Sequence, residues 1–428
     1  MDKILNEFFD YDRWLKAINT ADCKGINKGE LKLLCTPQVR ERLLDAIVQG
    51  NYEIAPPHAQ LILKDKPGEF RTVYINENVD RVFLSITNGI LFDLCGDMVH
   101  KQCKSYQSGI GCGKVVQQCS RYIGKMKTHN IGWKSDLSKY FDSVPLWAIT
   151  QVFDEVERRC GHSVIVDILR KYYKQNLCFD VDKNLTEKYM SLMQGCAVAS
   201  FLADAVLYEL DERMSKLNGF YVRYSDDCLY IGSDYDHAME IMREELGEYE
   251  LTLNPKKVEY LTNDRWFKFL GFSIRGTEIS ISKSRLKKFQ TEIEKRTVRN
   301  RKTSYKQAVN SVMRYMYVGD GKHSWASGIL PIMTNANDIE EMNEFVMDCL
   351  RATATKKRKV GGLGYIADGK EGVVARGTGK NVTANKKKTE QRLKGYVSLA
   401  EARNAMLTDR GAYNALIRTI RSANEYLR

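Results

Sequence analysis

The chain has 428 residues, of which 43% are apolar, and it carries a net charge of +12 at neutral pH. This length predicts two or three domains with a substantial core, and the charge favours a polyanionic partner such as nucleic acid. The eleven cysteines form no Cys-x-x-Cys pair and only six histidines are present, which argues against a zinc site. Cysteines scattered through apolar runs are typical of reduced core residues, so we expect a cytoplasmic protein. We expect neither a signal peptide nor a membrane span, because no apolar run is long enough for either.

The amino-terminal part of the chain reads as alternating helical and hairpin segments. Apolar residues at helical spacing predict helices, and alternating apolar residues flanked by turn residues predict hairpins. In chain order we expect helices over residues 1–60, a hairpin over 61–76, helices over 79–127, a strand within 131–143, helices over 146–175 and a hairpin over 220–231. The last hairpin has Tyr224-Ser225-Asp226-Asp227 at its tight turn, where Asp is tolerated.

The carboxyl-terminal part is expected to be helical and basic. After Phe272 the pattern predicts a short hairpin over 273–281, then basic helices over 282–297 and 304–317. Residues 351–390 carry eleven basic and three acidic residues with frequent glycines, which predicts a flexible basic segment. Within that segment, Lys356, Lys357, Arg358 and Lys359 are consistent with an RNA-binding patch or with a nuclear import signal. Residues 391–428 return to a helical pattern.

Asp226 and Asp227 are the strongest candidates for a site of chemistry. Paired acids on a hairpin framed by apolar residues are costly unless a cation holds them, and hard oxygen ligands suit Mg²⁺. For this motif alone, a merely solvated acidic turn is the alternative. Asp136 on the earlier strand changes the balance, because a two-metal site for phosphoryl transfer draws carboxylates from separate elements. The alternative for Asp136 is a helix cap or turn beside Ser138 and Asp142, and it is less favoured once both segments are considered.

These acids belong to an ordered set of motifs that extends over most of the chain. The set comprises Lys64 to Arg71, Asp80-Arg81, Tyr106-Gln107-Ser108-Gly109, Asp136 to Asp142, Gln194-Gly195, Leu202-Ala203-Asp204, Tyr224 to Asp227, Leu253-Asn254-Pro255-Lys256-Lys257 and Phe269-Leu270-Gly271-Phe272. In this order, from about Trp14 to Phe272, the chain resembles reverse transcriptases of the bacterial retroelement type and is closest in layout to the group II intron enzymes. The resemblance implies an RNA-directed DNA polymerase, a nucleotidyltransferase whose partners are an RNA template, a DNA product and deoxynucleoside triphosphates.

The resemblance also implies an α+β fold, the right-hand polymerase with interleaved fingers and palm. The expected parts are an amino-terminal helical extension (1–60), fingers (61–130), a palm with an antiparallel sheet and helices (131–275), a helical thumb (276–350), the basic segment (351–390) and a carboxyl-terminal helical segment (391–428).

Individual roles follow from the same resemblance. Asp136, Asp226 and Asp227 would be the catalytic, metal-binding carboxylates for two Mg²⁺ ions, with Mn²⁺ as a substitute. Phe141, five residues past Asp136, matches an aromatic gate that crowds a ribose 2′ hydroxyl and so favours deoxynucleotides. Lys64 and Arg71 would clamp the triphosphate, and Gln194 and Gly195 would line the nascent base pair. Lys257 would assist the pyrophosphate, a role for which Lys256 competes. Phosphate contacts in the thumb are expected of Arg285, Lys287 and Lys288.

The second palm motif departs from the family pattern, since Gly195-Cys196-Ala197-Val198-Ala199-Ser200 lacks the usual Pro. Three functions stay open. The leading one is an RNA-templated DNA polymerase. The others are an RNA-binding maturase-like factor that retains the polymerase fold, and a polymerase that makes untemplated or repetitive DNA. Because no nuclease module is recognisable, we expect a stand-alone enzyme with its own noncoding RNA, by analogy in antiphage defence.

Overall fold

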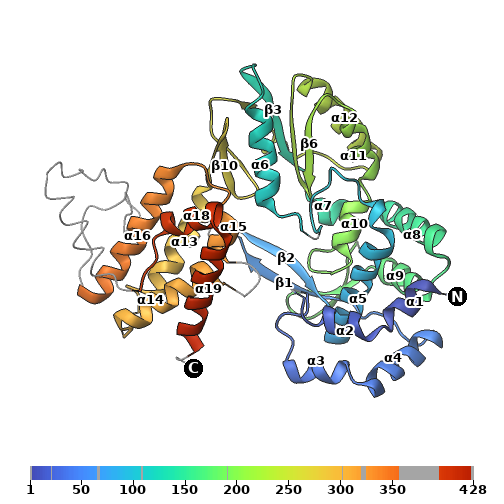
Figure 1. Cartoon of the computed structure of the whole chain (residues 1–428). Coiled ribbons are helices and arrows are strands. Elements are labelled where there is room, and N and C mark those ends of the chain that lie inside the picture. The colour runs from blue at the N-terminus through green and yellow to red at the C-terminus, as the bar shows by residue number, and fades with distance from the viewer. Residues whose placement is uncertain are drawn as a thin grey trace, which may run out of the picture. The chain divides into compact units, whose positions relative to one another are not determined.

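The computed structural model describes residues 2–20, 22–64, 68–107, 109–189, 191–300, 302–319, 324–355 and 395–425 (Figure 1). The chain forms two compact units, one of residues 1–111 with 128–262 and the other of residues 112–127 with 263–428. Both units combine helices with sheets, in agreement with the expected mixed class. Most of the expected basic segment, including Lys356, Lys357, Arg358 and Lys359, lies outside the described residues. Within the described part, none of the helices combines the length and the apolar character needed to cross a bilayer.

Four helices occupy the amino-terminal segment, namely α1 (Lys3–Phe8), α2 (Tyr11–Ala17), α3 (Lys28–Leu34) and α4 (Pro37–Val48). The first three begin at Asp2, Asp10 and Asn27, whose side chains each accept a hydrogen bond from the first helical turn. Helices thus cover the expected segment 1–60 only as far as Val48. Beyond that point Pro56 and Pro57 disfavour helix, because proline lacks an N–H and restricts the residue before it.

The hairpin predicted over residues 61–76 is confirmed. It consists of β1 (His58–Leu63) and β2 (Phe70–Ile75), which pair antiparallel from His58 opposite Ile75 to Leu63 opposite Phe70. At its tip the backbone N–H of Lys64 donates to the carbonyl of Glu69 at 2.8 Å. Two short strands, β4 (Leu177–Phe179) and β5 (Leu185–Glu187), extend it into a sheet of order β2-β1-β4-β5.

The main core of the first unit is built around one long helix. The helices concerned are α5 (Asn78–Cys95), its 3₁₀ extension η1 (Gly96–Met98), α8 (Leu146–Cys160), α9 (Val164–Lys174) and α10 (Ala199–Ala205). α5 packs against α1, α2, α8 and α10, and its Phe83 and Ile90 are completely buried. An apolar helix in contact with neighbours on several sides is typical of a core helix. The helices predicted over 146–175 are confirmed, and those predicted over 79–127 are found at 78–98 and 112–123 but not in the described residues between them.

A second sheet in this unit carries the acidic segments. It is antiparallel throughout and runs in the order β6-β7-β3-β8, with β3 (Asn130–Asp136), β6 (Gly219–Tyr224), β7 (Asp227–Gly232) and β8 (Glu259–Thr262). Helix α11 (Tyr208–Ser215) packs on it against β6 and α12 (Tyr235–Glu248) against β3 and β7, and the short α7 (Tyr140–Ser143) follows β3 (Figure 1). The strand and the hairpin that were predicted around the acids are therefore both confirmed.

The second unit joins one helix from the middle of the sequence to the carboxyl-terminal part. α6 (Cys112–Ile123) packs against β10 (Phe272–Arg275) and β11 (Glu278–Ile281), which form a sheet of order β11-β10-β9 with β9 (Phe267–Phe269). The short hairpin predicted over 273–281 is confirmed. The second unit thus includes α6 from the expected fingers range and β9 and β10 from the expected palm range.

Helices make up the rest of the second unit. They are α13 (Lys283–Arg296), α14 (Tyr305–Met313), the π-helix η2 (Arg314–Val318), α15 (Trp325–Ile329), α16 (Ala336–Thr355), α18 (Leu399–Thr408) and α19 (Arg410–Glu425). Ser282 and Ser304 cap α13 and α14, the two helices predicted over 282–297 and 304–317. Their apolar faces meet in a core that includes Phe289, Ile293 and Val312.

Candidate active site

The sheet brings the three predicted carboxylates together. β3 pairs antiparallel with β7 so that Asp136 lies directly opposite Asp227. Tyr224 pairs with Asp227, which leaves Ser225 and Asp226 as a two-residue turn. The backbone N–H of Leu137 donates to the carbonyl of Asp226 at 3.0 Å and ties this turn to the end of β3. Asp226 thus lies in the turn as predicted, whereas Asp227 is the first residue of β7 rather than part of the turn.

Burial and mutual repulsion make this cluster electrostatically unfavourable without a cation. Burial, together with the negative charges of Asp136 and Asp226, raises the pKa of Asp227 to about 7. Burial also raises the pKa of Asp226, while a backbone hydrogen bond and the positive charges of Lys257 and Arg71 oppose this rise. Three converging carboxylates provide the hard oxygen atoms that Mg²⁺ prefers, and a bound cation would relieve the repulsion. The donor set therefore fits a divalent metal.

Lys257, and not Lys256, is the lysine at this cluster. Its Nζ forms an ion pair with the carboxylate of Asp136. Burial lowers the pKa of Lys257, but the hydrogen bond to Asp136 and the charges of the three carboxylates outweigh this and raise it. Asn254 holds the loop in place, because its N–H donates to the carbonyl of Asp136 at 2.9 Å and its carbonyl accepts from the N–H of Lys257 at 2.9 Å.

Of the two predicted bases on the β1–β2 hairpin, Arg71 is the one that acts on the carboxylates. Arg71 is exposed on β2, opposite Ile62, and its charge opposes the rise in the pKa of Asp226. Lys64 is exposed at the end of β1, and its backbone closes the hairpin tip. The hairpin thus presents one base near the acids and one at its tip.

Phe141, Gln194 and Gly195 are brought together with β2. The carbonyl of Phe141 on α7 accepts from the N–H of Met193 at 3.2 Å, and the carbonyl of Gln194 accepts from the N–H of Tyr74 at 2.8 Å. Gly195 has a φ of +111°, and a Cβ there would lie 2.6 Å from the carbonyl oxygen of Tyr74. A side chain at this position would clash with β2, so Gly195 allows the close backbone approach that links the second palm motif to the hairpin that carries Arg71.

Comparison with known families agrees with this geometry. Residues 62–274 match the family model described as "Reverse transcriptase (RNA-dependent DNA polymerase)". The matched range includes β3, the β6–β7 hairpin and Lys257, and so all of the residues that converge at the carboxylates. Residues 62–274 form a reverse transcriptase domain. This domain indicates an RNA-directed DNA polymerase, which is a nucleotidyltransferase.

Several solved telomerase structures are similar to the chain at low identity. Apo telomerase from Candida tropicalis truncated from its C-terminal domain has 14% identity over 56% of this chain and 59% of that one, with a TM-score of 0.40. Telomerase from Candida albicans in complex with the TWJ fragment of telomeric RNA has 12% identity over 74% and 63%, with a TM-score of 0.40. Apo telomerase from Candida tropicalis has 12% identity over 70% and 57%, with a TM-score of 0.44. The chain thus spans about three fifths of the length of these telomerases. None of the curated protein sequences matches it.

The predicted phosphate-binding residues of α13 lie in different environments. Lys287 and Lys288 are exposed on the helix surface. Arg285 is half-buried instead, with its guanidinium 4.7 Å from the centre of the Phe272 ring, and burial lowers its pKa. A Cβ on Gly271 would lie 2.5 Å from Nη2 of Arg285, so this arginine packs beneath the β9–β10 turn. These contacts show that Arg285 packs within the unit, and its phosphate contact stays a prediction.

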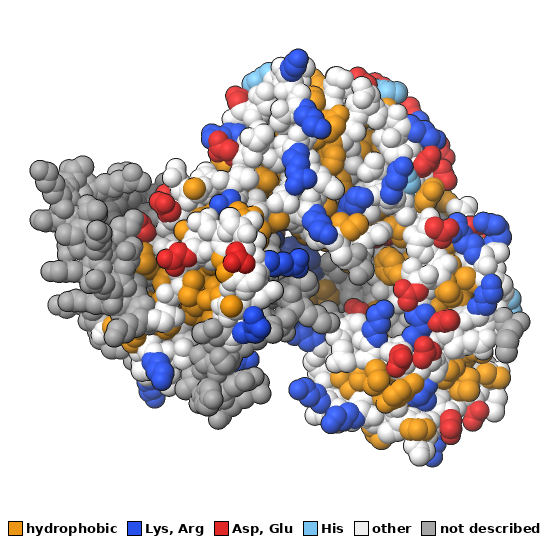
Figure 2. All heavy atoms as spheres, in the orientation of Figure 1, with side chains coloured by type: hydrophobic (Ala, Val, Ile, Leu, Met, Phe, Trp, Pro, Cys, Tyr) orange, Lys and Arg blue, Asp and Glu red, His pale blue; other side chains and the backbone are white. Residues whose placement is uncertain are grey.

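Basic side chains do not gather in a single patch on the surface that Figure 2 shows. On the described part of that face, Lys and Arg side chains are spread out, with Asp and Glu side chains among them. The positive net charge therefore does not by itself identify a nucleic-acid interface on this face, and site geometry is the better guide.

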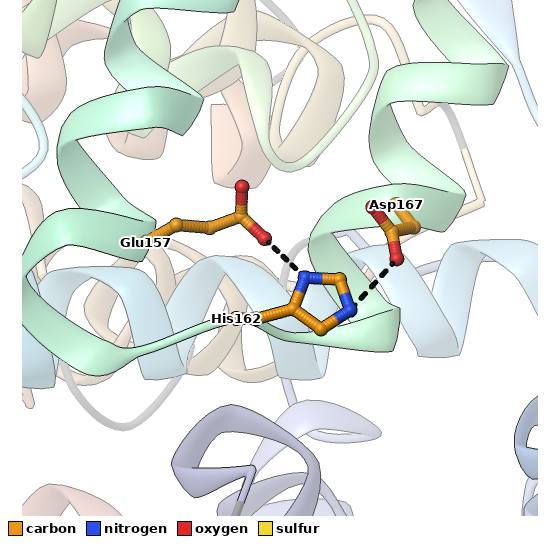
Figure 3. A group of neighbouring side chains, drawn as sticks. All are labelled: Glu157, His162 and Asp167. Carbon is orange, nitrogen blue, oxygen red and sulfur yellow. Dashed lines mark hydrogen bonds and ion pairs between the residues drawn. The ribbon is translucent and has the colours of Figure 1, made fainter.

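A second group of metal-ligand type lies at the α8–α9 connection of the same unit. The imidazole of His162 sits between two carboxylates, with Nδ1 3.0 Å from Glu157 and Nε2 3.4 Å from Asp167 (Figure 3). Glu157 also accepts from Arg170 at 2.8 Å. Because each ring nitrogen of His162 faces a carboxylate, the group links α8, which carries Glu157, to α9, which carries Asp167. Sequence reasoning did not single out these residues, although their regular spacing across a helix connection was visible.

The sequence also did not reveal a buried polar network beneath the β6–β7 turn of the reverse transcriptase domain. Arg223 is completely buried and forms an ion pair with Asp211 at 2.6 Å. It also donates to the carbonyls of Ala203 at 3.0 Å and Asp204 at 2.8 Å. Burial raises the pKa of Asp204 to about 6, although the charge of Arg223 opposes this. A buried arginine is tolerated only when its donors are paired, as they are in this network.

Proposed function

We propose that this enzyme adds deoxynucleotides to a primer 3′ end on an RNA template by two-metal phosphoryl transfer at Asp136, Asp226 and Asp227. The observation that carries the proposal is the convergence of these carboxylates from β3 and the β6–β7 hairpin, with the pKa of Asp227 raised to about 7. Such mutual repulsion is expected of carboxylates arranged to share cations. Bound Mg²⁺ or Mn²⁺ ions would activate the primer 3′ oxygen and stabilise the leaving pyrophosphate.

The remaining residues of the site neutralise and position the triphosphate. Arg71 and Lys64 on the β1–β2 hairpin would contact its phosphates, and the effect of Arg71 on Asp226 supports this for Arg71. Lys257 balances the charge of Asp136 and would offer a proton or a positive charge to the departing pyrophosphate. Phosphoryl transfer depends mainly on the positioning of the reactants and on charge neutralisation. The bases and carboxylates of this site are of the residue types that provide both.

Sugar selection is proposed for Phe141. The half-buried ring follows β3 on α7, and the backbone of Phe141 is joined to the Gln194–Gly195 loop through Met193. An aromatic ring at this place would crowd a ribose 2′ hydroxyl, whereas an RNA polymerase would gain from a polar partner for it. Gln194 and Gly195 would face the nascent base pair from the same loop.

The larger layout is proposed on the order of the motifs. We infer a right-hand arrangement with fingers, palm and thumb, in which Lys287, Lys288 and the basic segment 351–390 contact nucleic acid. The motif order supports a relative of the bacterial group II intron enzymes, and the cysteine usage supports a cytoplasmic setting. A cognate noncoding RNA template and a role in antiphage defence complete this proposal by analogy.

Primer extension with the purified chain tests the proposed chemistry. Extension of a DNA primer on an RNA template should require a divalent metal and should be lost in Asp226→Asn. RNA binding without any extension by the wild type would favour the maturase-like factor instead. Extension that is indifferent to the template sequence would favour a polymerase of untemplated or repetitive DNA. Extension by Asp226→Asn at the wild-type rate would place the chemistry elsewhere.

A further inference from the structure

The turn that carries Asp226 is held in place by Arg223 of β6 and by groups from outside the hairpin. Ser225 has a φ of +60°, a left-handed conformation that costs energy for a residue other than glycine. Its N–H donates to the hydroxyl of Ser105 at 2.9 Å, and its carbonyl accepts from Arg223 at 3.4 Å. The third support is the N–H of Leu137, which donates to the carbonyl of Asp226. A strained turn persists only where its surroundings determine it, and Ser105 provides the support for the strained residue's own N–H.

Ser105 reaches this turn because the segment before it pairs with the free edge of β6. The N–H of Arg223 donates to the carbonyl of Gln102 at 3.1 Å, and the N–H of Lys104 donates to the carbonyl of Arg223 at 2.8 Å. β6 is the outer strand of its sheet, so this segment continues the hydrogen bonding beyond it. The backbone of Ser105 is thereby fixed beside the end of β6, one residue beyond the paired Lys104.

The orientation of the Ser105 hydroxyl is set by Asp204. The hydroxyl donates to Oδ1 of Asp204 at 2.5 Å, and both side chains are completely buried. A hydroxyl has a single proton, so this donation leaves its lone pairs for the N–H of Ser225. Asp204 is itself held on α10, where its carbonyl accepts from Arg223. The chain of contacts therefore runs from α10 through Ser105 to the turn.

We propose that Ser105 and Asp204 are positioning residues for the polymerase reaction, which set the placement of Asp226 and Asp227 relative to Asp136. The inference rests on the proposed function of these three carboxylates. Neither residue touches substrate; each acts through the turn. Loss of the Ser105 hydroxyl leaves the N–H of Ser225 without its acceptor in a buried place, so the turn is expected to relax.

The kinetic test uses Ser105→Ala, Asp204→Ala and the double variant in primer extension. Each single variant should lower kcat by about 10- to 100-fold, the usual effect of removing a group that orients metal-binding side chains. KM for the deoxynucleotide should change by less than about threefold, because Arg71 and Lys64 are untouched. The double variant should be no worse than the single ones, since both substitutions remove one support. If Asp204→Ala does not fold, Asp204→Asn, which keeps an acceptor for the hydroxyl, should retain most of kcat.

Ser85→Ala is the matched control. Ser85 is another buried serine of the same unit, and its hydroxyl forms a hydrogen bond with the hydroxyl of Thr20 at 3.0 Å. Burial raises the pKa of Asp22, and a hydrogen bond from Ser85 opposes this rise. Loss of the Ser85 hydroxyl should lower the melting temperature about as much as Ser105→Ala but leave kcat unchanged. Equal loss of kcat in both variants, or unchanged kcat in Ser105→Ala, would overturn the proposal.

Hydrogen exchange measured by mass spectrometry separates this inference from the proposed function. Peptides that contain residues 224–228 should exchange faster in Ser105→Ala than in wild type or Ser85→Ala. If the wild type extends no primer but this acceleration is seen, the polymerase proposal fails and the support of the turn by Ser105 stands. Unchanged exchange in Ser105→Ala would refute that support whatever the activity.

Discussion

Replacing Asp227 by Asn is expected to stabilise the metal-free protein above neutral pH. The pKa of Asp227 is raised from 3.8 to about 7 by burial and by the charges of Asp136 and Asp226. The folded chain therefore binds this proton more tightly than the unfolded chain does. Stability falls as the pH rises from about 4 to about 7, and the whole penalty is present above that range. An uncharged Asn removes the penalty with little change in shape.

The magnitude follows from the size of the shift. About three pKa units correspond to ~4 kcal/mol of free energy of unfolding. Because the side chain of Asp227 is only partly buried, solvent screening reduces the expected gain to ~1–2 kcal/mol. For a unit of this size, such a gain raises the melting temperature by roughly 3–6 °C.

Thermal unfolding followed by circular dichroism, with a chelator present, measures this gain. Asp227→Asn should melt above the wild type at about pH 8.5, and the difference should shrink toward pH 5. Added Mg²⁺ should raise the melting temperature of the wild type and reduce the difference between the wild type and Asp227→Asn. Asp182→Asn, at an exposed position of the same unit, should change the melting temperature at neither pH. If Asp227→Asn melts below the wild type at both pH values, the acid stabilises the fold and the repulsion argument is refuted.

Three further outcomes are expected. Phe141→Ala should raise ribonucleotide relative to deoxynucleotide incorporation by roughly 10- to 200-fold in competition assays, and unchanged discrimination would remove Phe141 from the gate role. Lys257→Ala should lower kcat by about 10- to 100-fold in primer extension, while Lys256→Ala should stay within about twofold; equal effects would mean that the ion pair with Asp136 does not matter. Neutralising residues 356–359 together should weaken RNA binding and flatten its salt dependence by roughly 0.7 per lost contact in titrations at several salt concentrations, and an unchanged slope would make the segment a solvated linker.

The carboxylates could be predicted from the sequence because each lies in a short motif with a local signature. The alternating apolar residues around Asp226 and Asp227 predict the hairpin, and the strand pattern before Asp136 predicts its neighbour. Antiparallel pairing then needs only the correct register to bring the acids together. The single difference, Asp227 on the strand and not in the turn, comes from a two-residue loop whose length the pattern alone does not determine.

Roles that depend on burial were harder to predict. Arg285 reads as one of several bases on a basic helix, yet in the structure it packs over Phe272 beneath Gly271. A glycine with a φ of +79° leaves the space that the guanidinium fills, and nothing local to α13 signals this. Lys256 and Lys257 are adjacent in sequence, and only the folded loop shows which one reaches Asp136.

The partition of the chain was also not visible in its motifs. α6 lies between segments of the first unit in sequence, but it packs against β10 and β11 of the second. A pattern of apolar residues shows that a helix has a buried face and does not show which partner covers it. The fingers, palm and thumb boundaries drawn from the family resemblance therefore stay predictions.

The support of the Ser225–Asp226 turn illustrates why a short motif is not a complete site. Ser225 adopts a left-handed φ where glycine or asparagine would be easier, so the motif Tyr-Ser-Asp-Asp depends on groups that lie far away in sequence. Ser105 is 120 residues from Ser225 and 99 from Asp204, and single-sequence reasoning has no means of pairing serines and acids over such separations. Carboxylates that repel one another keep their positions only if the backbone that carries them is held rigidly. In our proposal the buried contacts of Ser105 and Arg223 hold the backbone of this turn, so the substitutions that test its rigidity lie outside the motif.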